Sequence, residues 1–538
     1  MAEYDFIVVG AGSAGCVLAS RLSESGRFSV LLVEAGGSDR SFWLMMPIGY
    51  GKAFYDKRCN WMYMTEPDQG LNGRQSYWPR GKALGGSSAI NAMIFVRGHS
   101  SDFDGWAAMG NPGWGWDEVL PYFKKLESND RGADSLRGAD GPVRIESKEN
   151  DVHPLCQSFL KAGAELGMRK NTDFNGPELD GFGVYQITTK DGMRMSAARA
   201  YLRPARGRAN LRVETGAFTQ TILFDGKRAT GIRYRQNGNE HTARARREVI
   251  LSAGAINSPQ LLQLSGVGPG ALLQTLGIPV VAALEGVGRH LQDHLCIDYL
   301  FRSRVPTLNN QLSPFMGRLR YGLQYLLSRT GPLSLGINHA GGFVHTAPGL
   351  AAPNMQLFFS PMSYTKAPPG KRPLMRPDPF PGFALAAQPT RPTSRGHLAL
   401  RSPDASASPA IHPNYLSTEF DQQEMIVASR LVRRIAATPA LSAVIAEELA
   451  PGPSVTSDEA MLDDCRARAG TVYHPVSTCR MGPDPAEDVV DAALRVHGIT
   501  NLRVADASIF PTLTTGNTNA AAIMVGEKAS DLILSAHR

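Results

Sequence analysis

The feature that most constrains the fold lies at the start of the chain, where a short apolar run leads directly into a glycine-rich turn. Residues 6–9 read Phe-Ile-Val-Val, a continuous apolar run typical of a parallel strand that is buried on both faces. Gly10, Gly12 and Gly15 follow at once, and apolar residues at helical spacing come after them. This order predicts a strand, a phosphate-binding turn and a helix, which together form a dinucleotide-binding unit.

Each position in this turn has an expected role. Gly10 permits the tight turn, Gly12 lets a pyrophosphate approach the backbone, and Gly15 lets the helix pack closely on the strand. The positive N-terminal end of the helix points at the phosphates. Glu34 ends the second apolar strand, 19 residues after Gly15, where a carboxylate can accept hydrogen bonds from a ribose. The pattern does not distinguish FAD from NAD, and a purely structural glycine turn is the alternative.

Length and charge limit the classes of function. A chain of 538 residues is too long for one ordinary core, so we expect at least two domains. The net charge of +7 comes from basic and acidic residues scattered along the chain, which indicates a mildly basic solvated surface. The sequence shows no basic stripe with interleaved aromatic residues, so nothing in it favours nucleic-acid binding.

Compartment and metal content are predicted from the cysteines and the N-terminus. The six cysteines are far apart and show neither CxxC nor zinc spacing, so we expect free buried thiols, no metal site and a reducing compartment. The first strand begins near residue 4, and no apolar run of about 20 residues could span a bilayer. These features predict a cytoplasmic protein and leave peripheral contact with the inner membrane open.

A second glycine-rich segment lies at residues 79–92, with the sequence PRGKALGGSSAINA. Small residues from Gly85 to Ser88 suit backbone that lies directly against a flat or phosphorylated ligand. A flexible loop is the alternative. The apolar run that follows at once is helix-like, so we expect a helix there, and this disfavours the flexible loop.

This segment is part of a specific resemblance. Residues 81–104 and 254–268 resemble the two signatures of the glucose-methanol-choline (GMC) oxidoreductase family, and residues 473–482 and 504–511 fit the same family. The resemblance covers essentially the whole chain. It implies FAD as the cofactor and makes a nicotinamide enzyme an unfavourable alternative.

The resemblance also implies an α/β architecture with two discontinuous domains. A Rossmann-like FAD-binding domain is expected from residues 1–150, 196–295 and 456–538. A substrate-binding domain, an antiparallel sheet with helices on one side, is expected from residues 151–195 and 296–455, with proline-rich loops at 361–381 and 389–413. Strands at 221–224, 231–234 and 248–251 are separated by the turn signals Asp225-Gly226 and Asn237-Gly238.

By motif and resemblance, the cofactor is expected to contact a set of backbone and small polar positions. These are Gly10, Gly12, Ser13, Ala14, Gly15, Glu34, Ala35, Arg80, Gly81, Leu84, Gly85, Gly86, Ser87, Asn91, Ala92, Ala253, Asp506, Ala507, Asn517, Thr518 and Asn519. Asp506 is expected at the ribityl-pyrophosphate region. The amphipathic run 521–534 is expected to form a helix whose N-terminus faces the flavin.

Two residues are expected to be catalytic. His474, in Tyr-His-Pro, can accept the proton of an alcohol, and its place in the family motif favours this role over that of an ordinary loop histidine. Asn517 falls at the position of the family's second catalytic residue, where it would hold the substrate oxygen; the alternative is a helix N-cap. The substrate carbon would pass hydride to flavin N5.

Two departures from the choline-specific members bear on substrate and linkage. Ile90 stands where covalently flavinylated members carry a histidine, so FAD is expected to be non-covalent. His339-Ala340 stands where choline-recognising members place a glutamate before Gly341-Gly342-Phe343, so a neutral alcohol is expected.

We therefore expect an FAD-dependent dehydrogenase of neutral primary alcohols or polyols. The alternatives are a choline dehydrogenase, an oxygen-using alcohol oxidase, a hydroxynitrile-type lyase with structural FAD, and a non-catalytic flavin-binding protein. The electron acceptor (quinone, cytochrome or oxygen) and the oligomeric state stay open.

Overall fold

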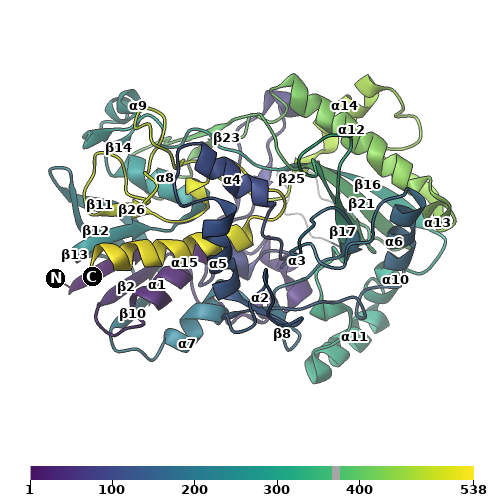
Figure 1. Ribbon diagram of the computed structural model, residues 1–538, viewed down its shortest axis with the longest axis horizontal. Helices are drawn as coiled ribbons and strands as arrows, with labels where there is room; N and C mark the ends of the chain where they lie inside the picture. The colour runs from purple at the N-terminus through teal and green to yellow at the C-terminus, as the bar shows by residue number, and fades with distance from the viewer. Residues whose placement is uncertain (1, 366–375) are drawn as a thin grey trace.

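The computed structural model describes residues 2–365 and 376–538 and places two sheets side by side (Figure 1). Both chain termini lie at the outer end of the first sheet, on the left of Figure 1. The second sheet, with the helices that cover it, forms the right half of that view.

The first sheet is mostly parallel and contains the N-terminal strand. Its order is β10 (Leu211–Thr215), β2 (Val30–Glu34), β1 (Ala2–Val9), β13 (Asn239–Leu251), β12 (Arg228–Gln236) and β11 (Ala217–Asp225), with β26 (Leu502–Val504) also pairing with β13. β10, β2, β1, β13 and β26 pair in parallel, and β11 to β13 form an antiparallel meander. Phe6 to Val9 are buried, as expected of a strand that is covered on both faces.

The meander confirms the predicted turn signals and lengthens the predicted strands. Asn237 and Gly238 both have positive φ, +51° and +83°, which is the backbone of the hairpin turn that Asn-Gly favours. The strands are longer than predicted because each carries polar residues on its exposed face, and these hide the apolar alternation at the strand ends.

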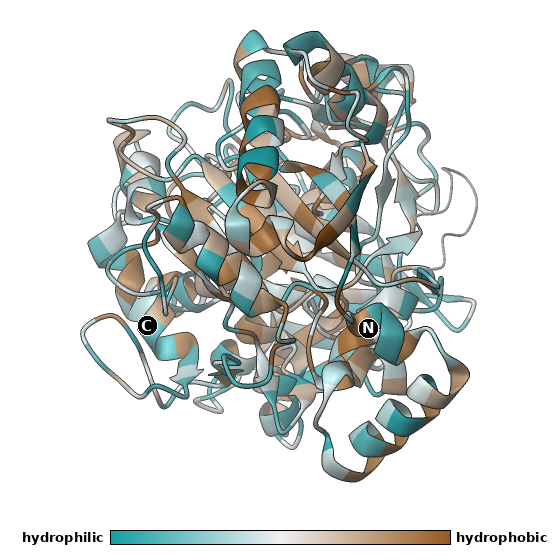
Figure 2. Ribbon diagram, turned by 90° about the vertical axis from the view of Figure 1, so that its right-hand side faces the viewer, coloured by the Kyte–Doolittle hydropathy of each residue, from teal (hydrophilic) through white to brown (hydrophobic). Residues whose placement is uncertain are grey.

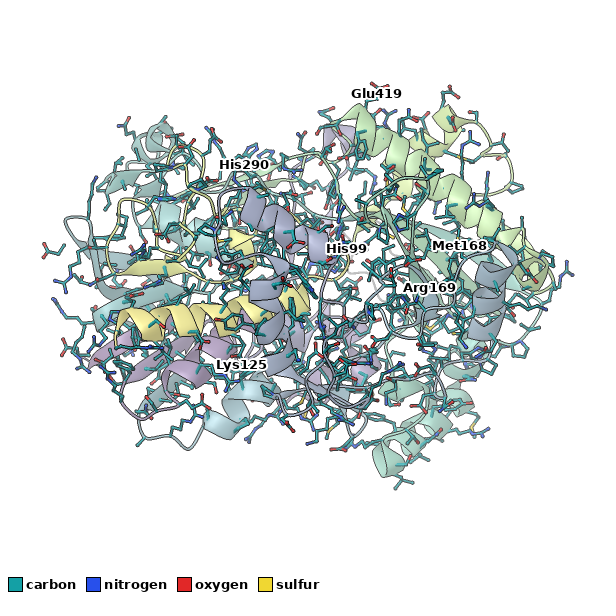
Figure 3. All side chains as sticks on the ribbon, in the orientation of Figure 1. His99, Lys125, Met168, Arg169, His290 and Glu419 are labelled. Carbon is teal, nitrogen blue, oxygen red and sulfur yellow. The ribbon has the colours of Figure 1, made fainter. Side chains whose placement is uncertain are left out.

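The C-terminal helix lies against the first helix of the chain. α1 (Ser13–Leu22) and α15 (Asn519–Ala536) pack on each other, and Arg21 binds the buried carboxylate of Glu527 at 2.8 Å. Lys125 of α5 (Trp116–Leu126), labelled in Figure 3, pairs with Glu527 and Asp531 at 3.3 Å each. The predicted amphipathic run is thus helical, but it is buried on all sides from Ala520 to Ser530 because elements pack around it.

The second sheet is antiparallel. Its order is β24 (Ile445–Ala450), β16 (Leu295–Ser303), β21 (Gly382–Pro389), β18 (Met355–Ser360), β17 (Ala340–Val344) and β7 (Gly181–Val184), and β25 (Gly470–Thr471) also pairs with β16. Odd-numbered residues of β16, β18 and β21, such as Tyr299 and Leu385, pack in one apolar core with α6 (Cys156–Glu165) and α12 (Glu419–Ala436). Helices therefore cover one face, as expected, and even-numbered residues point to the other.

The remaining helices are short and surround the two sheets. They are α2 (Phe42–Met45), α3 (Tyr50–Ala53), α4 (Ser100–Ala108), α7 (Arg203–Ala205), α8 (Gly254–Leu264), α9 (Gly270–Thr275), α10 (Leu308–Leu312), α11 (Phe315–Ser328), α13 (Pro439–Ser442) and α14 (Asp458–Arg468). Six small two-strand ladders complete the described part of the chain. They are β3 (Tyr63–Met64) with β4 (Tyr77–Trp78), β5 (Glu127–Asn129) with β6 (Val143–Ile145), β8 (Thr189–Lys190) with β9 (Met193–Arg194), β14 (Val267–Gly268) with β15 (Ala282–Ala283), β19 (Tyr364–Thr365) with β20 (Arg376–Pro377), and β22 (His397–Ala399) with β23 (Ala410–His412).

The helix expected after the second glycine segment is not formed. Only a single 3-10 turn, Gly86–Ala89, is present, and the next helix along the chain, α4, begins at Ser100. The side chain of Asn91 accepts a hydrogen bond from the N–H of Met93 and another from Arg194, and these bonds replace a helical ladder.

The domain limits stay a prediction. α14 packs on α12 and β16, and β25 pairs with β16, so residues 458–471 lie with the second sheet although the expected limit is residue 456. Part of the proline-rich loop at 361–381 lies outside the described residues. The six cysteines are free and buried, as predicted. In the described part of the chain, none of the helices has both the length and the apolar character that a membrane span requires.

Candidate active site

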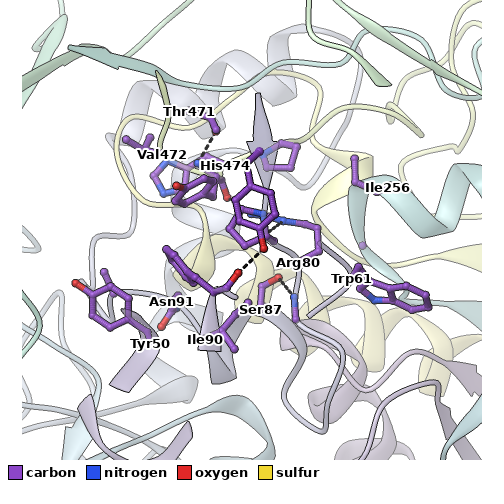
Figure 4. A pocket seen from close by; sticks show the side chains of 18 of the residues that line it. Tyr50, Trp61, Arg80, Ser87, Ile90, Asn91, Ile256, Thr471, Val472 and His474 are labelled. Carbon is purple, nitrogen blue, oxygen red and sulfur yellow. Dashed lines mark hydrogen bonds between the residues drawn. The ribbon is translucent and has the colours of Figure 1, made fainter. Parts of the chain in front are cut away.

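A cavity of about 1490 Å³ lies between the two sheets (Figure 4). One end is formed by the glycine turn after β1, at Gly10 and Gly12. The other end is formed by even-numbered residues of the second sheet, among them Phe358 and Ala386, which are register partners on β18 and β21. The cavity therefore connects a nucleotide-binding turn to the open face of an antiparallel sheet.

The glycine turn is built for close backbone contact. A Cβ on Gly15 would lie 1.9 Å from the carbonyl oxygen of Gly10, and a Cβ on Gly86 would lie 2.7 Å from the Cα of Gly12. The two glycine-rich segments thus pack directly on each other. α1 begins at Ser13, and its N-cap, Gly12, supplies no side-chain cap, so the first-turn N–H groups are available to an anion.

The Glu34 carboxylate holds the backbone of this turn by hydrogen bonds. Its two carboxylate oxygens accept hydrogen bonds from the N–H groups of Ala11, at 2.9 Å, and Gly36, at 2.8 Å. Burial raises the pKa of Glu34 to about 7, although these two bonds favour the charged form. Each oxygen keeps a second lone pair, so the carboxylate can still accept from a ribose hydroxyl.

Asp506 has an equivalent role beside α8. One oxygen accepts from the Gly254 N–H at 2.8 Å and from the Ser258 hydroxyl at 2.6 Å, and the other accepts from the Ser508 N–H at 2.8 Å. It therefore fixes the start of α8 against the 3-10 turn Ala507–Ile509, at the edge of the cavity.

His474 and Asn517 meet at the cavity wall. Asn517 Nδ2 lies 3.2 Å from His474 Nε2, and both residues line the cavity. On its other side, His474 Nδ1 lies 3.0 Å from His294 Nδ1, and His294 Nε2 lies 3.0 Å from the carbonyl oxygen of Thr390.

These contacts define one set of tautomers. A carbonyl oxygen can only accept, so His294 carries its proton on Nε2 and, when neutral, accepts at Nδ1. His474 must then donate from Nδ1, which leaves the Nε2 of a neutral His474 with a free lone pair. That lone pair receives the Asn517 amide and can act as a base.

Asn517 is itself fixed from behind. Gln356 Nε2 donates to Asn517 Oδ1 at 3.2 Å, and Gln388 Nε2 donates to Gln356 Oε1 at 2.9 Å. Because the Asn517 oxygen is occupied as an acceptor, its amide nitrogen points to His474 as a donor.

The backbone around His474 is held in an unusual conformation. Tyr473 has φ +71° and Ser477 has φ +74°, both in the left-handed region. Asp293 accepts from the His474 N–H at 2.7 Å, and Arg80 donates to the Tyr473 carbonyl at 2.6 Å. These contacts aim the imidazole into the cavity, as Figure 4 shows.

Burial sets the protonation state of this histidine pair. It lowers the pKa of His474 well below its usual value, and the neighbouring His294 and Arg80 lower it further. Burial also lowers the pKa of His294 to about 4. Both imidazoles are therefore neutral at pH 7, in agreement with the tautomers above.

Most of the predicted site residues line this cavity. They are Gly10, Gly12, Ser13, Ala14, Glu34, Ala35, Arg80, Gly81, Gly86, Ser87, Asn91, Ala92, Ala253, His474, Asp506, Ala507, Asn517, Thr518 and Asn519. Gly15, Leu84 and Gly85 are not among the lining residues. Gly15 packs on Gly10 and Gly85 on Ser196, so their places are behind the wall.

Sequence reasoning missed several residues of this site. His294, Gln356 and Gln388 support the histidine and the amide, and Tyr50, Phe54, Ile337, Phe358 and Val472 line the cavity. His294 lies at the end of the segment 196–295 that was expected in the FAD-binding domain, and no motif marks it. The concentration of aromatic residues between residues 42 and 78 is a signal of an apolar wall, but no local pattern predicts which of them face the cavity.

Two sequence profiles of a known protein family match this chain. Residues 4–296 match the N-terminal and residues 392–526 the C-terminal sequence profile of the GMC oxidoreductases. The chain belongs to the GMC oxidoreductase family. The resemblance seen in the signatures is thus confirmed for most of the chain, and a GMC oxidoreductase is an enzyme that uses FAD.

Individual relatives are similar to this chain over 90% or more of their own length. Human (Homo sapiens) choline dehydrogenase, a mitochondrial protein, is 44% identical over 99% of this chain and 90% of that protein. Alcohol dehydrogenase [acceptor] of Pseudomonas putida is 43% identical over 99% of this chain and 96% of its own length. A solved variant of Aspergillus oryzae formate oxidase, studied for FAD modification, has a TM-score of 0.91 at 26% identity and covers 100% of this chain and 99% of that one.

Proposed function

We propose that this GMC oxidoreductase oxidises the CH–OH group of a neutral primary alcohol or polyol to a carbonyl, with His474 as the base and Asn517 as the group that holds the substrate oxygen. The observation that carries the proposal is the His474–Asn517 pair, whose Nε2 and Nδ2 atoms are 3.2 Å apart at the wall of the cavity. FAD fits the cavity because two glycine-rich segments and an uncapped helix N-terminus offer backbone contacts at its other end.

The two side chains divide the work by their chemistry. An alcohol oxygen that approaches both atoms accepts from Asn517 Nδ2–H and donates its proton to His474 Nε2. When His474 accepts this proton at Nε2, its Nδ1–H still donates to neutral His294. The transferred proton can therefore stay on His474 Nε2. The bond between His294 Nε2–H and Thr390 keeps the pair in register.

The cofactor supplies the other half of the reaction. When bound, FAD would supply the acceptor for the hydride of the alcohol carbon. The N-terminus of α15 begins at Asn519 without a side-chain cap, and it offers N–H groups and partial positive charge at the cavity. Glu34 and Asp506 are proposed to hold the ribose and the ribityl-pyrophosphate region.

FAD is proposed to be held without a covalent bond. Ile90 is buried at the cavity wall. By the resemblance, this is the position where covalently flavinylated family members carry a linking histidine. The Ile90 side chain has no nucleophile, so it cannot form that bond. The acceptor that reoxidises the cofactor, a quinone, a cytochrome or oxygen, is left open.

Choline is the second candidate substrate. The 44% identity to human choline dehydrogenase favours it. His339 lies outside the cavity lining and is buried, and its Nδ1 accepts from the His153 N–H at 3.1 Å, so it takes no part in recognising a cation. Asp298 of β16 and Asp378 do line the cavity and are carboxylates that could attract one.

One anaerobic experiment tests the proposal. Purified holoprotein is mixed with a panel of neutral alcohols, polyols and choline, and the flavin absorbance at about 450 nm is followed. Bleaching by at least one neutral alcohol supports the proposal. If no member of the panel bleaches the flavin, a lyase with structural FAD becomes the better interpretation.

A further inference from the structure

One helix presents its apolar side to solvent instead of to the core. On α11, the side chains of Phe315, Met316, Leu319, Leu323, Leu326 and Leu327 are exposed, from 46% for Leu319 to 86% for Leu327. Their spacing of three and four residues places them on one side of the helix. Apolar surface of this kind marks an interaction site, because folded proteins rarely expose such stripes.

A neighbouring element extends this surface. In α2, Phe42 is 40% and Trp43 is 37% exposed. The ring of Phe42 packs edge-on against the ring of Tyr325 of α11, with 6.3 Å between the ring centroids. We use the term "α11 face" for the six exposed α11 residues together with Phe42 and Trp43. The helix projects from the lower edge of the molecule in Figures 1 and 2, and its hydropathy colours alternate along its length.

Most charges around the α11 face are positive, although the exposed Asp191 lies beside Gly192, which contacts Tyr325 and Arg329. Arg318 and Arg320 are exposed on the same helix, Arg329 follows it, and the Lys52 ammonium lies 4.5 Å from the Trp43 ring centre. From residue 299 to residue 377 the chain has no Asp or Glu. A second copy of this chain would bring the same arginines together across a two-fold axis, whereas an anionic surface would neutralise them.

The geometry points to one occupant: we propose that the α11 face docks on the surface of a bilayer that contains anionic lipid, with α11 lying in the plane of the interface. Exposed leucines and aromatic residues would enter the boundary of the acyl chains, and the arginines would bind lipid phosphates. This mode needs no spanning helix.

The position of the helix gives this docking a use. Tyr321 of α11 and Leu333 pack on an apolar cluster that includes Tyr50, Phe54 and Ile337. These three residues also line the active-site cavity. The helix α11 and the cavity thus share one apolar wall, which suits exchange of an apolar substrate or acceptor with the membrane.

Vesicle co-sedimentation of the holoprotein tests the proposal. We expect the wild type to pellet with vesicles of phosphatidylcholine and phosphatidylglycerol, and less with phosphatidylcholine alone. The double variant Leu323→Asp with Leu327→Asp should bind about tenfold or more weakly, since two charges enter the apolar boundary. Arg318→Gln with Arg320→Gln should weaken binding and reduce its dependence on salt.

A matched control is available on the opposite side of the molecule. Phe420 is the second residue of α12, whose first residue, Glu419, is labelled at the top of Figure 3. Phe420 is 52% exposed, so Phe420→Asp replaces another exposed apolar residue with a charge. It should bind vesicles like the wild type. All variants should keep flavin content and alcohol-dependent bleaching in solution, which separates this proposal from the proposed function.

Three results would overturn the proposal. The first is wild-type protein that pellets equally with and without the anionic lipid. The second is a leucine double variant that binds like the wild type. The third is a wild-type dimer, seen by light scattering, that this variant converts to a monomer while neither protein binds vesicles; a second copy would then cover the face.

Discussion

His474 is the residue on which the proposed chemistry depends. Replacing it by alanine removes the only lone pair that the tautomers leave facing Asn517. We expect His474→Ala to slow flavin reduction by alcohol by about 100- to 10,000-fold, roughly 3–5 kcal/mol in the barrier, with FAD still bound. Anaerobic stopped-flow measurement of the reduction rate checks this.

The pH profile separates the base from its neighbour. Because burial lowers the pKa of His474, the wild-type rate should be flat near neutrality and should fall only below about pH 6.5, as the imidazole gains a proton. Asn517 does not titrate, so Asn517→Ala should be slower but keep this limb. A low-pH limb that survives in His474→Ala would identify some other group as the base.

Glu34 gives a second test at this scale, through stability. Its folded pKa, about 7, lies above the ordinary value of 4.5, so the folded apoprotein holds this proton more tightly than the unfolded chain does. The free energy of unfolding of the wild type minus that of Glu34→Gln should therefore be largest below pH 4.5. It should fall by up to about 3 kcal/mol as the pH rises to about 7.

Denaturant unfolding of both apoproteins across this range measures that difference. Glutamine is the matched control because it has similar shape and does not titrate. A difference that grows as the pH rises would mean that the turn stabilises the carboxylate anion instead.

Ile90 leads to a prediction about the cofactor bond. Since its side chain cannot bond to the flavin, acid precipitation of the holoprotein should release all the FAD to the supernatant. Absorbance of the two fractions gives the result. Flavin colour retained in the pellet would show that another residue of the cavity forms a covalent link.

At the scale of elements, the contact between the two glycine-rich segments is the most constrained feature. Gly86 has φ +51°, and a Cβ there would lie 2.7 Å from Gly12 Cα. Gly86→Ala should therefore push the segments apart, lower FAD occupancy and lower the melting temperature. Gly105→Ala in α4 is the control, because no atom lies within 4 Å of the new Cβ and alanine favours a helix. Equal flavin content in the two variants would contradict this account.

The elements also explain what could be predicted from the sequence. The strand, turn and helix from Phe6 to Leu22 were predicted because their signals are local: an apolar run, glycines and helical spacing. The helix expected after Ala89 was wrong because Asn91 binds Met93 and Arg194, and Arg194 lies about a hundred residues away. Likewise His294, Gln356 and Gln388 come from separate strands or loops, and only the folded sheet brings them to His474 and Asn517.

At the scale of the whole molecule, the cavity joins two sheets that contribute different chemistry. The first sheet supplies the backbone turn, and the second supplies side chains of alternate residues, such as Phe358 and Ala386. His474 and Asn517 lie where the two meet. The nucleotide end follows from a general motif, whereas the substrate end depends on which residues of the second sheet face inward.

That inward face leads to the last prediction, which concerns substrate charge. The cavity wall includes uncharged residues such as Ile90, Phe358 and Val472, while Asp298 and Asp378 also line the cavity. Choline and 3,3-dimethylbutan-1-ol have nearly the same shape, but only choline carries a charge. If no carboxylate stands at the bound trimethyl group, the neutral alcohol should have the higher kcat/KM, because it avoids the cost of desolvating a cation. Steady-state rates with both compounds measure the ratio of their kcat/KM values.

The contrary outcome is a kcat/KM that favours choline by tenfold or more. If Asp298→Asn or Asp378→Asn reverses that preference, the cation site is assigned to that carboxylate, and choline becomes the better substrate class.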